Sequence, residues 1–287
     1  MNSFLSKIIL LYPQIQLTEK SFIDMLNAKV WDGFLVHKVE KDFLLTALLV
    51  KIGEKYPELI FKGGTCLNKC YFPYFRLSED LDFVLIADVG RDTRKKILED
   101  WKMELMKFIQ IFWWAWVDKR TKYNEDQQWL FEFSYISLLD ESLQTIKIDI
   151  SLKEKLEKSP VPKKIQSLFV DSVFWWEIFP EKEIFCMDLD EIIAEKIRAA
   201  LTRTAIRDYF DLYYIVEQTG RDFSELTELI TIKLAEVNFA YRDGYEILKK
   251  QVETDLRPVL RDMMGFDFDT MWRFVQSFKP VNAQLIQ

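Results

Sequence analysis

Residues 61–83 contain two features that could bind a phosphorylated substrate: a pair of adjacent glycines and, further along, two aspartates separated by one residue. Gly63 and Gly64 lack a Cβ atom, so their backbone amides could approach a phosphate closely. Asp80 and Asp82 alternate with apolar residues, which predicts a strand with both carboxylates on one face. Two carboxylates so close repel each other unless a divalent cation lies between them, and Mg²⁺ or Mn²⁺ prefers such oxygen ligands.

A third carboxylate, Asp149, lies between two isoleucines in the alternating segment 145–152. We expect it to be buried in a strand, where a carboxylate is costly unless it is paired or bound to a metal. We expect it not to pair with Lys147, and we interpret it as completing the metal site or as helping to deprotonate an attacking hydroxyl. The plainer alternative for Asp80 and Asp82 is the polar face of an edge strand.

Several cations follow later in the chain. Lys196, Arg203 and Arg207 are spaced at i, i+7 and i+11, which would place them on one face of a continuous helix, where they could bind a polyphosphate or an RNA backbone. A solvated charged face is the alternative. Asp208 could instead pair with Arg203 or Arg207 and join the helical half to the catalytic half. The only histidine is His37, so a histidine base or nucleophile is not expected.

These residues carry a resemblance. The segments Gly-Gly-Thr at 63–65 and Arg-Leu-Ser-Glu-Asp-Leu-Asp-Phe at 76–83 resemble the polymerase-beta-type nucleotidyltransferases and, more narrowly, the AbiEii/AbiGii toxin family, which includes the MenT-type toxins. Residues 147–149 are similar to the Lys-x-Asp element of that family. Glu195-Lys196 and residues 207–213 resemble its C-terminal lysine and aspartate elements. The resemblance spans roughly residues 60 to 215, about half of the chain.

The resemblance implies an α+β fold, in which a polymerase-beta-type mixed sheet flanked by helices is followed by a C-terminal helical bundle. It implies Mg²⁺-dependent (or Mn²⁺-dependent) transfer of a nucleoside monophosphate from an NTP to an acceptor. Asp80, Asp82 and Asp149 would hold the ions, one bridging the triphosphate and one lowering the pKa of the acceptor hydroxyl. Lys196 would steady the leaving pyrophosphate, with Asp211 as a further catalytic residue.

The residues that this interpretation assigns to nucleotide binding are Lys62, Gly63, Gly64, Thr65, Ser78, Lys147, Arg207 and Asp208. For the two hydroxyl residues, a turn or cap role is an alternative to a phosphate contact. The resemblance further implies a toxin of a toxin–antitoxin or abortive-infection pair, which has a cognate antitoxin as partner and adds nucleotides to tRNA 3′ ends.

Two other classes of function stay open. The first is a nucleotidyltransferase with a small-molecule or protein acceptor, which the net charge of −7 favours because a general nucleic-acid surface is basic. The second is a non-catalytic interaction protein on the same fold. The three aspartates argue against this class, because a site that has lost its activity has no reason to keep a cluster of carboxylates that costs folding free energy.

Composition indicates a globular protein of two domains. The 287 residues are 49% hydrophobic and include only 8 Gly and 8 Pro, which argues against repeats, linkers and disorder. We expect a nucleotidyltransferase domain with N-terminal helices over 1–187 and a helical domain over 188–287. The apolar stretch 108–117 is too short to span a membrane and is expected to be core or an interface.

The three cysteines, Cys66, Cys70 and Cys186, are an odd number, which indicates reduced thiols in a cytoplasmic protein. Cys66 and Cys70 have the i, i+4 spacing of one helix face. A zinc ion there would need two more ligands, so core packing is expected.

Hydrophobic periodicity predicts the elements that must position these residues. Helices are expected in short pieces before residue 40 and then at 41–56, 65–71 and 91–117. Strands are expected at 59–61, 81–86, 129–138, 145–152 and 184–187, the third and fourth as antiparallel neighbours of the central strand 81–86, with a loop at 153–164. In the second half, helices are expected at 189–202, 205–219, 224–238, 243–264 and 268–278. Asp188 should cap the first of these helices with Glu191 as its capping partner, and Pro258 should kink the fourth.

Overall fold

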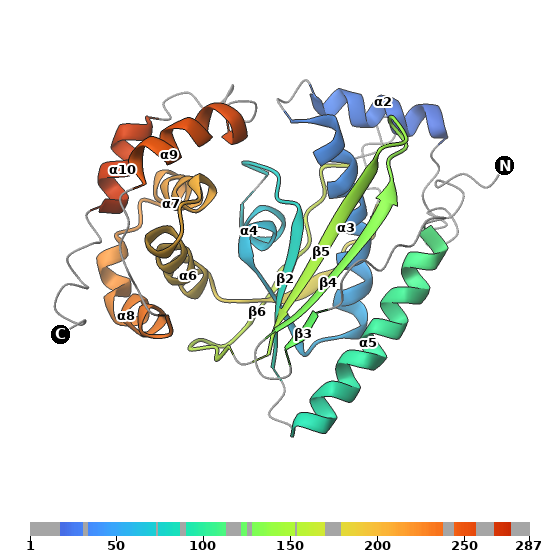
Figure 1. The fold of residues 1–287 in the computed structure, drawn as a ribbon, viewed down its shortest axis with the longest axis horizontal. Coiled ribbons are helices and arrows are strands. Elements are labelled where there is room, and N and C mark those ends of the chain that lie inside the picture. Colours follow the sequence, from blue (N-terminus) through green and yellow to red (C-terminus); the bar gives the residue numbers. More distant parts are fainter. Residues whose placement is uncertain are drawn as a thin grey trace. The chain divides into compact units, whose positions relative to one another are not determined.

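The structure, a computed structural model, describes residues 18–30, 34–72, 74–86, 90–112, 122–124, 128–152, 154–169, 179–237, 244–256 and 267–276. The chain divides into two compact units, one of Met1–Lys155 with Pro160–Cys186 and one of Leu156–Ser159 with Met187–Gln287. The first contains a mixed sheet with helices and the second is helical (Figure 1). Among the described residues, no helix is both long enough and apolar enough to cross a membrane.

The described strands of the first unit form one mixed sheet in the order β3-β4-β5-β2-β1-β7-β6. Its strands are β1 (Leu59–Lys62), β2 (Asp80–Leu85), β3 (Lys122–Asn124), β4 (Gln128–Ile136), β5 (Leu143–Ser151), β6 (Val161–Lys164) and β7 (Glu183–Cys186). Its helical segments are α2 (Glu19–Val30), α3 (Val36–Lys55), α4 (Gly63–Cys66), which continues as the π-helical turn η1 (Leu67–Tyr71), and α5 (Arg91–Phe112).

One face of this sheet is apolar. Phe83 of β2 is in register with Phe61 of β1 and with Ile150 of β5, and directly opposite residues share a face. All three side chains are fully buried. The ring of Trp101 in α5 packs edge-on against Trp129 of β4, with 5.6 Å between the ring centroids. The ring of Tyr56, which follows α3, packs edge-on against the same Trp101, with 6.4 Å between the ring centroids. The residues that alternate with this apolar set point to the opposite, polar face.

The five predicted strands are confirmed in position, whereas β3 was not predicted, and two further predictions are wrong. Neither β4 nor β5 is an antiparallel neighbour of β2: β5 runs parallel to β2, and β4 pairs with β5 as the other arm of a hairpin. Residues 161–164, expected to be loop, form β6 in spite of Pro162. β6 is the last strand of the sheet and pairs only with β7, and an edge strand tolerates a proline.

The helices of the first unit begin and end near the expected residues. The amphipathic helix expected at 41–56 begins earlier, at Val36, and the helix expected after the glycine turn begins at Gly63. The apolar stretch 108–117, and Pro258 of the second unit, lie outside the residues whose side chains the structure describes.

The second unit consists of helices. They are α6 (Leu189–Thr202), α7 (Ile206–Thr219), η2 (Phe223–Leu226), α8 (Thr227–Ala235), α9 (Tyr245–Gln251), η3 (Val252–Leu256) and α10 (Phe268–Gln276). Asp188 caps α6 as predicted, because its carboxylate accepts a hydrogen bond from the backbone N–H of Asp190 at 3.0 Å. Glu191 is not its capping partner. The Glu191 carboxylate forms a fully buried ion pair with Lys233 of α8 at 2.7 Å and accepts two hydrogen bonds from the backbone at 157 and 158.

A second buried ion cluster joins α6 to α7. Lys196 Nζ lies 3.0 Å from Asp208 Oδ1 and 2.8 Å from Asp211 Oδ2. Arg203 Nε donates to Asp208 Oδ2 at 2.6 Å, so Arg203 is one of the two partners expected for Asp208, and both residues belong to the second unit. Burial alone would raise the pKa of Asp208, but the positive charges of Lys196 and Arg203 outweigh it and lower that pKa to about 2.

The pKa of Asp208 predicts an acid-sensitive contribution to stability. Because its folded-state pKa lies below the ordinary value of 3.8, the ionised carboxylate stabilises the fold above about pH 4, and this stabilisation is lost as the pH falls toward 2. Asp208→Asn should therefore lower the free energy of unfolding at pH 7 by about 2 kcal/mol. Urea titrations of both proteins at pH 7 and pH 3 should show the difference shrinking at the lower pH. An equal difference at both pH values would contradict the assignment.

Candidate active site

The register of two parallel strands brings the predicted carboxylates together. In the β2–β5 pair, Asp82 lies opposite Asp149 and Asp80 lies opposite Lys147. Neighbouring strands are about 4.8 Å apart, and residues two apart in one strand share a face. Asp80, Asp82 and Asp149 therefore all project from the polar face of the sheet, where each is half-buried.

Asp149 is less buried than expected, because the isoleucines on either side of it take the apolar face and leave Asp149 on the polar face. The Gln128 side chain donates a hydrogen bond to Asp149 Oδ2, a contact that the sequence did not suggest. Lys147 shares the polar face two residues away, but its side chain is exposed. Partial burial raises the pKa of Asp149 and the negative charge of Asp80 raises it further, whereas Gln128 and Lys62 act in the opposite direction.

The glycine turn packs directly against this carboxylate group. Gly63 has a φ of 78°, which favours glycine, and a Cβ atom on it would lie 2.2 Å from Asp82 Oδ2. A Cβ atom on Gly64 would lie 2.5 Å from an Arg76 guanidinium nitrogen and 3.2 Å from Ser78 Oγ. Both glycines are therefore required by the close approach of the turn to the segment that begins β2.

Two of the residues assigned to nucleotide binding have structural contacts. The Thr65 hydroxyl donates to the backbone carbonyl of Asp80, which anchors α4 to the first residue of β2. Lys62 lies opposite Asp82 in the β1–β2 register, so it belongs to the polar face, and it forms an ion pair with Glu154 in which both side chains are largely buried. The ion pair with Glu154 was not predicted from the sequence, because residue 154 lies in a segment predicted to be a loop. The Lys62 ammonium supplies positive charge beside the aspartates.

The C-terminal candidates lie in the second unit. Lys196, Asp208 and Asp211 are brought together in the buried cluster described above, whereas Arg207 is exposed. A common face of Lys196, Arg203 and Arg207 would require a continuous helix, and the structure has two separate helices there. α6 ends at Thr202, Arg203 has an extended backbone, and α7 begins at Ile206.

The donor set of the polar face fits a hard divalent cation, because every candidate ligand there is a carboxylate oxygen. The ligand oxygens of the three aspartates do not all lie within 4.8 Å of one another; of the residues that the structure describes, only Cys66, Cys70 and Cys186 form a potential metal-binding group with that spacing. A cation on this face would therefore draw the carboxylates closer, and the attraction would oppose the repulsion between them.

Comparison with known proteins identifies a family that this chain matches. Residues 47–279 match the family described as "Nucleotidyl transferase AbiEii toxin, Type IV TA system". The chain is also similar to a crystal structure described as a candidate nucleotidyltransferase from Helicobacter pylori, with 17% identity over 88% of this chain and 97% of that chain and a TM-score of 0.49. A second crystal structure, JHP933 from Helicobacter pylori, is similar with 18% identity over 86% of this chain and 96% of that chain and a TM-score of 0.47. A comparison with curated proteins finds no match.

The family match rests on sequence and covers the glycine turn, the three aspartates and the Lys196–Asp211 cluster. A nucleotidyltransferase consumes a nucleoside triphosphate, and a toxin of a toxin–antitoxin system has an antitoxin as its counterpart. The polar face of the sheet is consistent with this chemistry. The chain belongs to the AbiEii nucleotidyl transferase toxin family of type IV toxin–antitoxin systems, and it is a nucleotidyltransferase.

Proposed function

We propose that this protein is a Mg²⁺-dependent toxin that transfers a nucleoside monophosphate from an NTP to the 3′ end of tRNA and so blocks growth. Asp80, Asp82 and Asp149 are the metal ligands of this proposal. It places the enzyme in the cytoplasm, where NTPs, Mg²⁺ and tRNA occur together, and a cognate antitoxin protein limits its activity.

The observation that carries the proposal is the contact between the glycine turn and Asp82. Gly63 has no room for a Cβ atom beside Asp82 Oδ2, and Asp82 lies opposite Asp149 on the next strand. A phosphate chain at the turn would thus lie next to the carboxylates that hold its metal ion. Structural packing alone would not require two half-buried aspartates to face each other across a parallel strand pair, since like charges there oppose folding.

Each residue of the polar face has a part in this proposal. Asp80, Asp82 and Asp149 would hold the cation, which when bound would neutralise charge on the triphosphate and lower the pKa of the acceptor hydroxyl. Asp149 completes the metal site in this proposal, and a bound cation would oppose the burial and the charge of Asp80 that raise the pKa of this carboxyl. Lys62 offsets part of the negative charge of the aspartates. Gly63, Gly64 and Ser78 would contact the phosphates, with Lys147 at the open edge of the site.

The candidate residues of the second unit have a different role in this proposal. Lys196 contacts Asp208 and Asp211, so its ammonium is neutralised within the second unit. We propose that Lys196 and Asp211 act mainly as positioning residues that fix α7 to α6. The contact of Lys196 with leaving pyrophosphate stays a prediction, as do the nucleotide contacts of Arg207 and Asp208.

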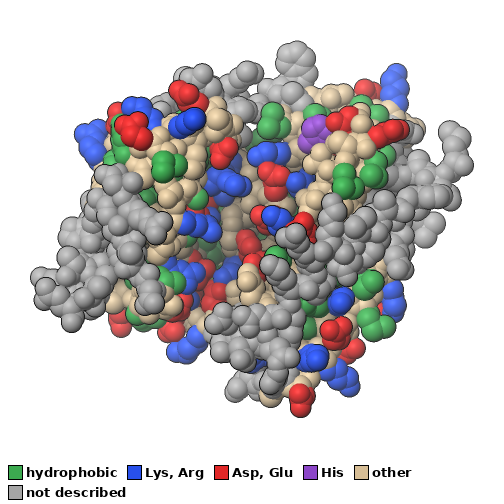
Figure 2. Space-filling model, in the orientation of Figure 1, with side chains coloured by type: hydrophobic (Ala, Val, Ile, Leu, Met, Phe, Trp, Pro, Cys, Tyr) green, Lys and Arg blue, Asp and Glu red, His purple; other side chains and the backbone are tan. Residues whose placement is uncertain are grey.

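A small-molecule or protein acceptor is the second candidate. The chain has a net charge of −7. On the face drawn in Figure 2, Lys and Arg side chains are interspersed with Asp and Glu side chains and do not form one broad basic area. An RNA acceptor would then bind through a local set of cations, and its affinity would depend only moderately on salt.

The proposal predicts metal-dependent labelling of tRNA. The full-length protein should transfer label from one or more α-labelled NTPs to total tRNA in the presence of Mg²⁺, and EDTA should abolish the transfer. Asp82→Asn should lower the rate at least about 100-fold, because it removes charge at the point where the cation and phosphates meet. Asp100→Asn, an exposed change in α5 of the same unit, is the matched control and should leave the rate unchanged.

The acceptor is identified in the same experiment, since products are separated on denaturing gels and by thin-layer chromatography. Label on the tRNA 3′ end, lost after removal of the terminal nucleotide, supports the proposal. Label on protein or on a small molecule would replace tRNA with the second candidate. Absence of transfer with all four NTPs, in a preparation whose melting temperature rises with Mg²⁺ and NTP, would refute the tRNA proposal.

The glycine contact predicts a second effect. Gly63→Ala should cost about 1–2 kcal/mol of stability because of its positive φ, and it should also abolish transfer because the new Cβ displaces the Asp82 carboxylate. Gly220→Ala is the matched control: Gly220 also has a positive φ, 62°, but a Cβ atom there would meet nothing within 4 Å. Both variants should lose stability in urea unfolding, Gly63→Ala more than Gly220→Ala because only its new Cβ displaces a neighbouring side chain, and only Gly63→Ala should lose activity. Equal activities would show that the turn does not position Asp82 for catalysis.

A further inference from the structure

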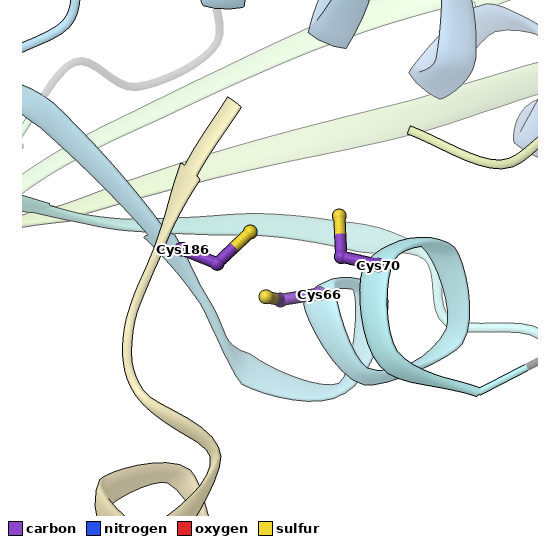
Figure 3. A group of neighbouring side chains, drawn as sticks. All are labelled: Cys66, Cys70 and Cys186. Carbon is purple, nitrogen blue, oxygen red and sulfur yellow. The ribbon is translucent and has the colours of Figure 1, made fainter. Parts of the chain in front are cut away.

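The three cysteines form one buried cluster. Cys66 of α4, Cys70 of η1 and Cys186 of β7 have Sγ atoms that all lie within 4.8 Å of one another. Cys66 and Cys186 are 0% exposed and Cys70 is 6% exposed. Figure 3 shows Cys66 and Cys70 on successive turns of the helical segment, with Cys186 facing them from the strand. The sequence predicted that these cysteines pack in the core. It did not predict that Cys186 would lie beside the other two.

The sheet brings the third thiol to the other two. Cys186 lies opposite Phe61 in the parallel β1–β7 pair, and Phe61 lies opposite Phe83 of β2. Cys186 therefore projects from the apolar face of the sheet, and the cluster lies on the opposite face from Asp82 and Asp149. A ligand of the cysteines would therefore bind at a different place from a ligand of the carboxylates.

The chemistry of this group is specific. Thiolate sulfur is a soft ligand that prefers Cu(I) and other thiophilic ions over Mg²⁺ or Mn²⁺. With metal–sulfur bonds of about 2.3 Å, sulfurs around a single ion are about 4 Å apart, close to the spacing in the protein. Zn²⁺ in structural sites takes four ligands, and among the described residues no His, Cys, Asp or Glu adds a fourth to this group. Three sulfurs suit a trigonal ion.

We propose that Cys66, Cys70 and Cys186 bind one thiophilic metal ion, with Cu(I) as the representative, in a three-sulfur site. The ion would cross-link β7 to the helical segment that begins at Gly63. It would therefore stabilise the part of the first unit from which the glycine turn projects. This site is independent of the proposed transfer reaction, and its test does not require activity.

A lysine charge lies near two of the three sulfurs. Lys163 of β6 lies over the ring of Tyr71, 4.7 Å from its centroid, and its positive charge acts on both Cys70 and Cys186. Cys70 is also the least buried of the three, so an ion could reach the cluster at this residue.

The test uses the reduced full-length protein under anaerobic conditions, with Cu(I) supplied as its bicinchoninate complex. The protein should remove one Cu(I) per chain from the chelator, and X-ray absorption of the loaded protein should show three sulfur neighbours at about 2.3 Å. Cu(I) should also raise the melting temperature, since it should bind the folded cluster more tightly than the separated thiols of the unfolded chain. The X-ray absorption result on the unaltered protein keeps the test decisive even where a cysteine variant fails to fold.

The variants identify the ligands. Cys66→Ser, Cys70→Ser and Cys186→Ser should each weaken Cu(I) binding at least 10-fold, and the gain in melting temperature should disappear. His37→Gln, which removes the only histidine, is the matched control and should bind Cu(I) as the unaltered protein does. If the triple variant Cys66→Ser/Cys70→Ser/Cys186→Ser removed Cu(I) from bicinchoninate as well as the unaltered protein does, the proposal would be overturned. X-ray absorption that shows nitrogen or oxygen neighbours of the copper ion, or only two sulfur neighbours, would overturn the proposal as well.

Discussion

The parallel pairing of β2 with β5 is the constraint on which the site depends. It places Asp82 directly opposite Asp149, with Asp80 on the same face. Such an arrangement costs folding free energy because like charges are held close in a half-buried setting. The chain offsets part of that cost locally, through the Lys62 ammonium and through the hydrogen bond that Gln128 donates to Asp149. The remaining negative charge is what a cation would offset in the proposed reaction.

The glycine turn gives this charged face its geometry. A side chain at Gly63 would occupy the position of the Asp82 carboxylate, so the turn and the carboxylate can be neighbours only because the Cβ atom is absent. The Thr65 hydroxyl then ties the helix after the turn to the backbone of Asp80. The turn and the strand are therefore fixed to each other at two points, so a phosphate bound at the turn in the proposed reaction would lie beside the strand that carries Asp80 and Asp82.

Local patterns in the sequence were sufficient to predict part of this arrangement. Alternation of apolar and polar residues predicted β2, β4 and β5 within two residues, and the Gly-Gly pair marked the turn. The direction of β5 relative to β2, the presence of β6 with Pro162 at the sheet edge, and the contacts of Gln128 and Glu154 could not be predicted in the same way. Each depends on which distant segments become neighbours, and a one-dimensional period contains no such information.

The same distinction explains why the cysteine cluster was missed and why its chemistry differs from that of the aspartates. Cys66 and Cys70 are neighbours by helical spacing, but Cys186 joins them only through the β1–β7 pair, more than a hundred residues later in the chain. Alternation along the strands then separates the two groups of ligands, with oxygen on the polar face and sulfur on the apolar face. Because hard cations prefer carboxylate oxygen and soft ions prefer thiolate, one sheet can offer both kinds of ligand without competition between them.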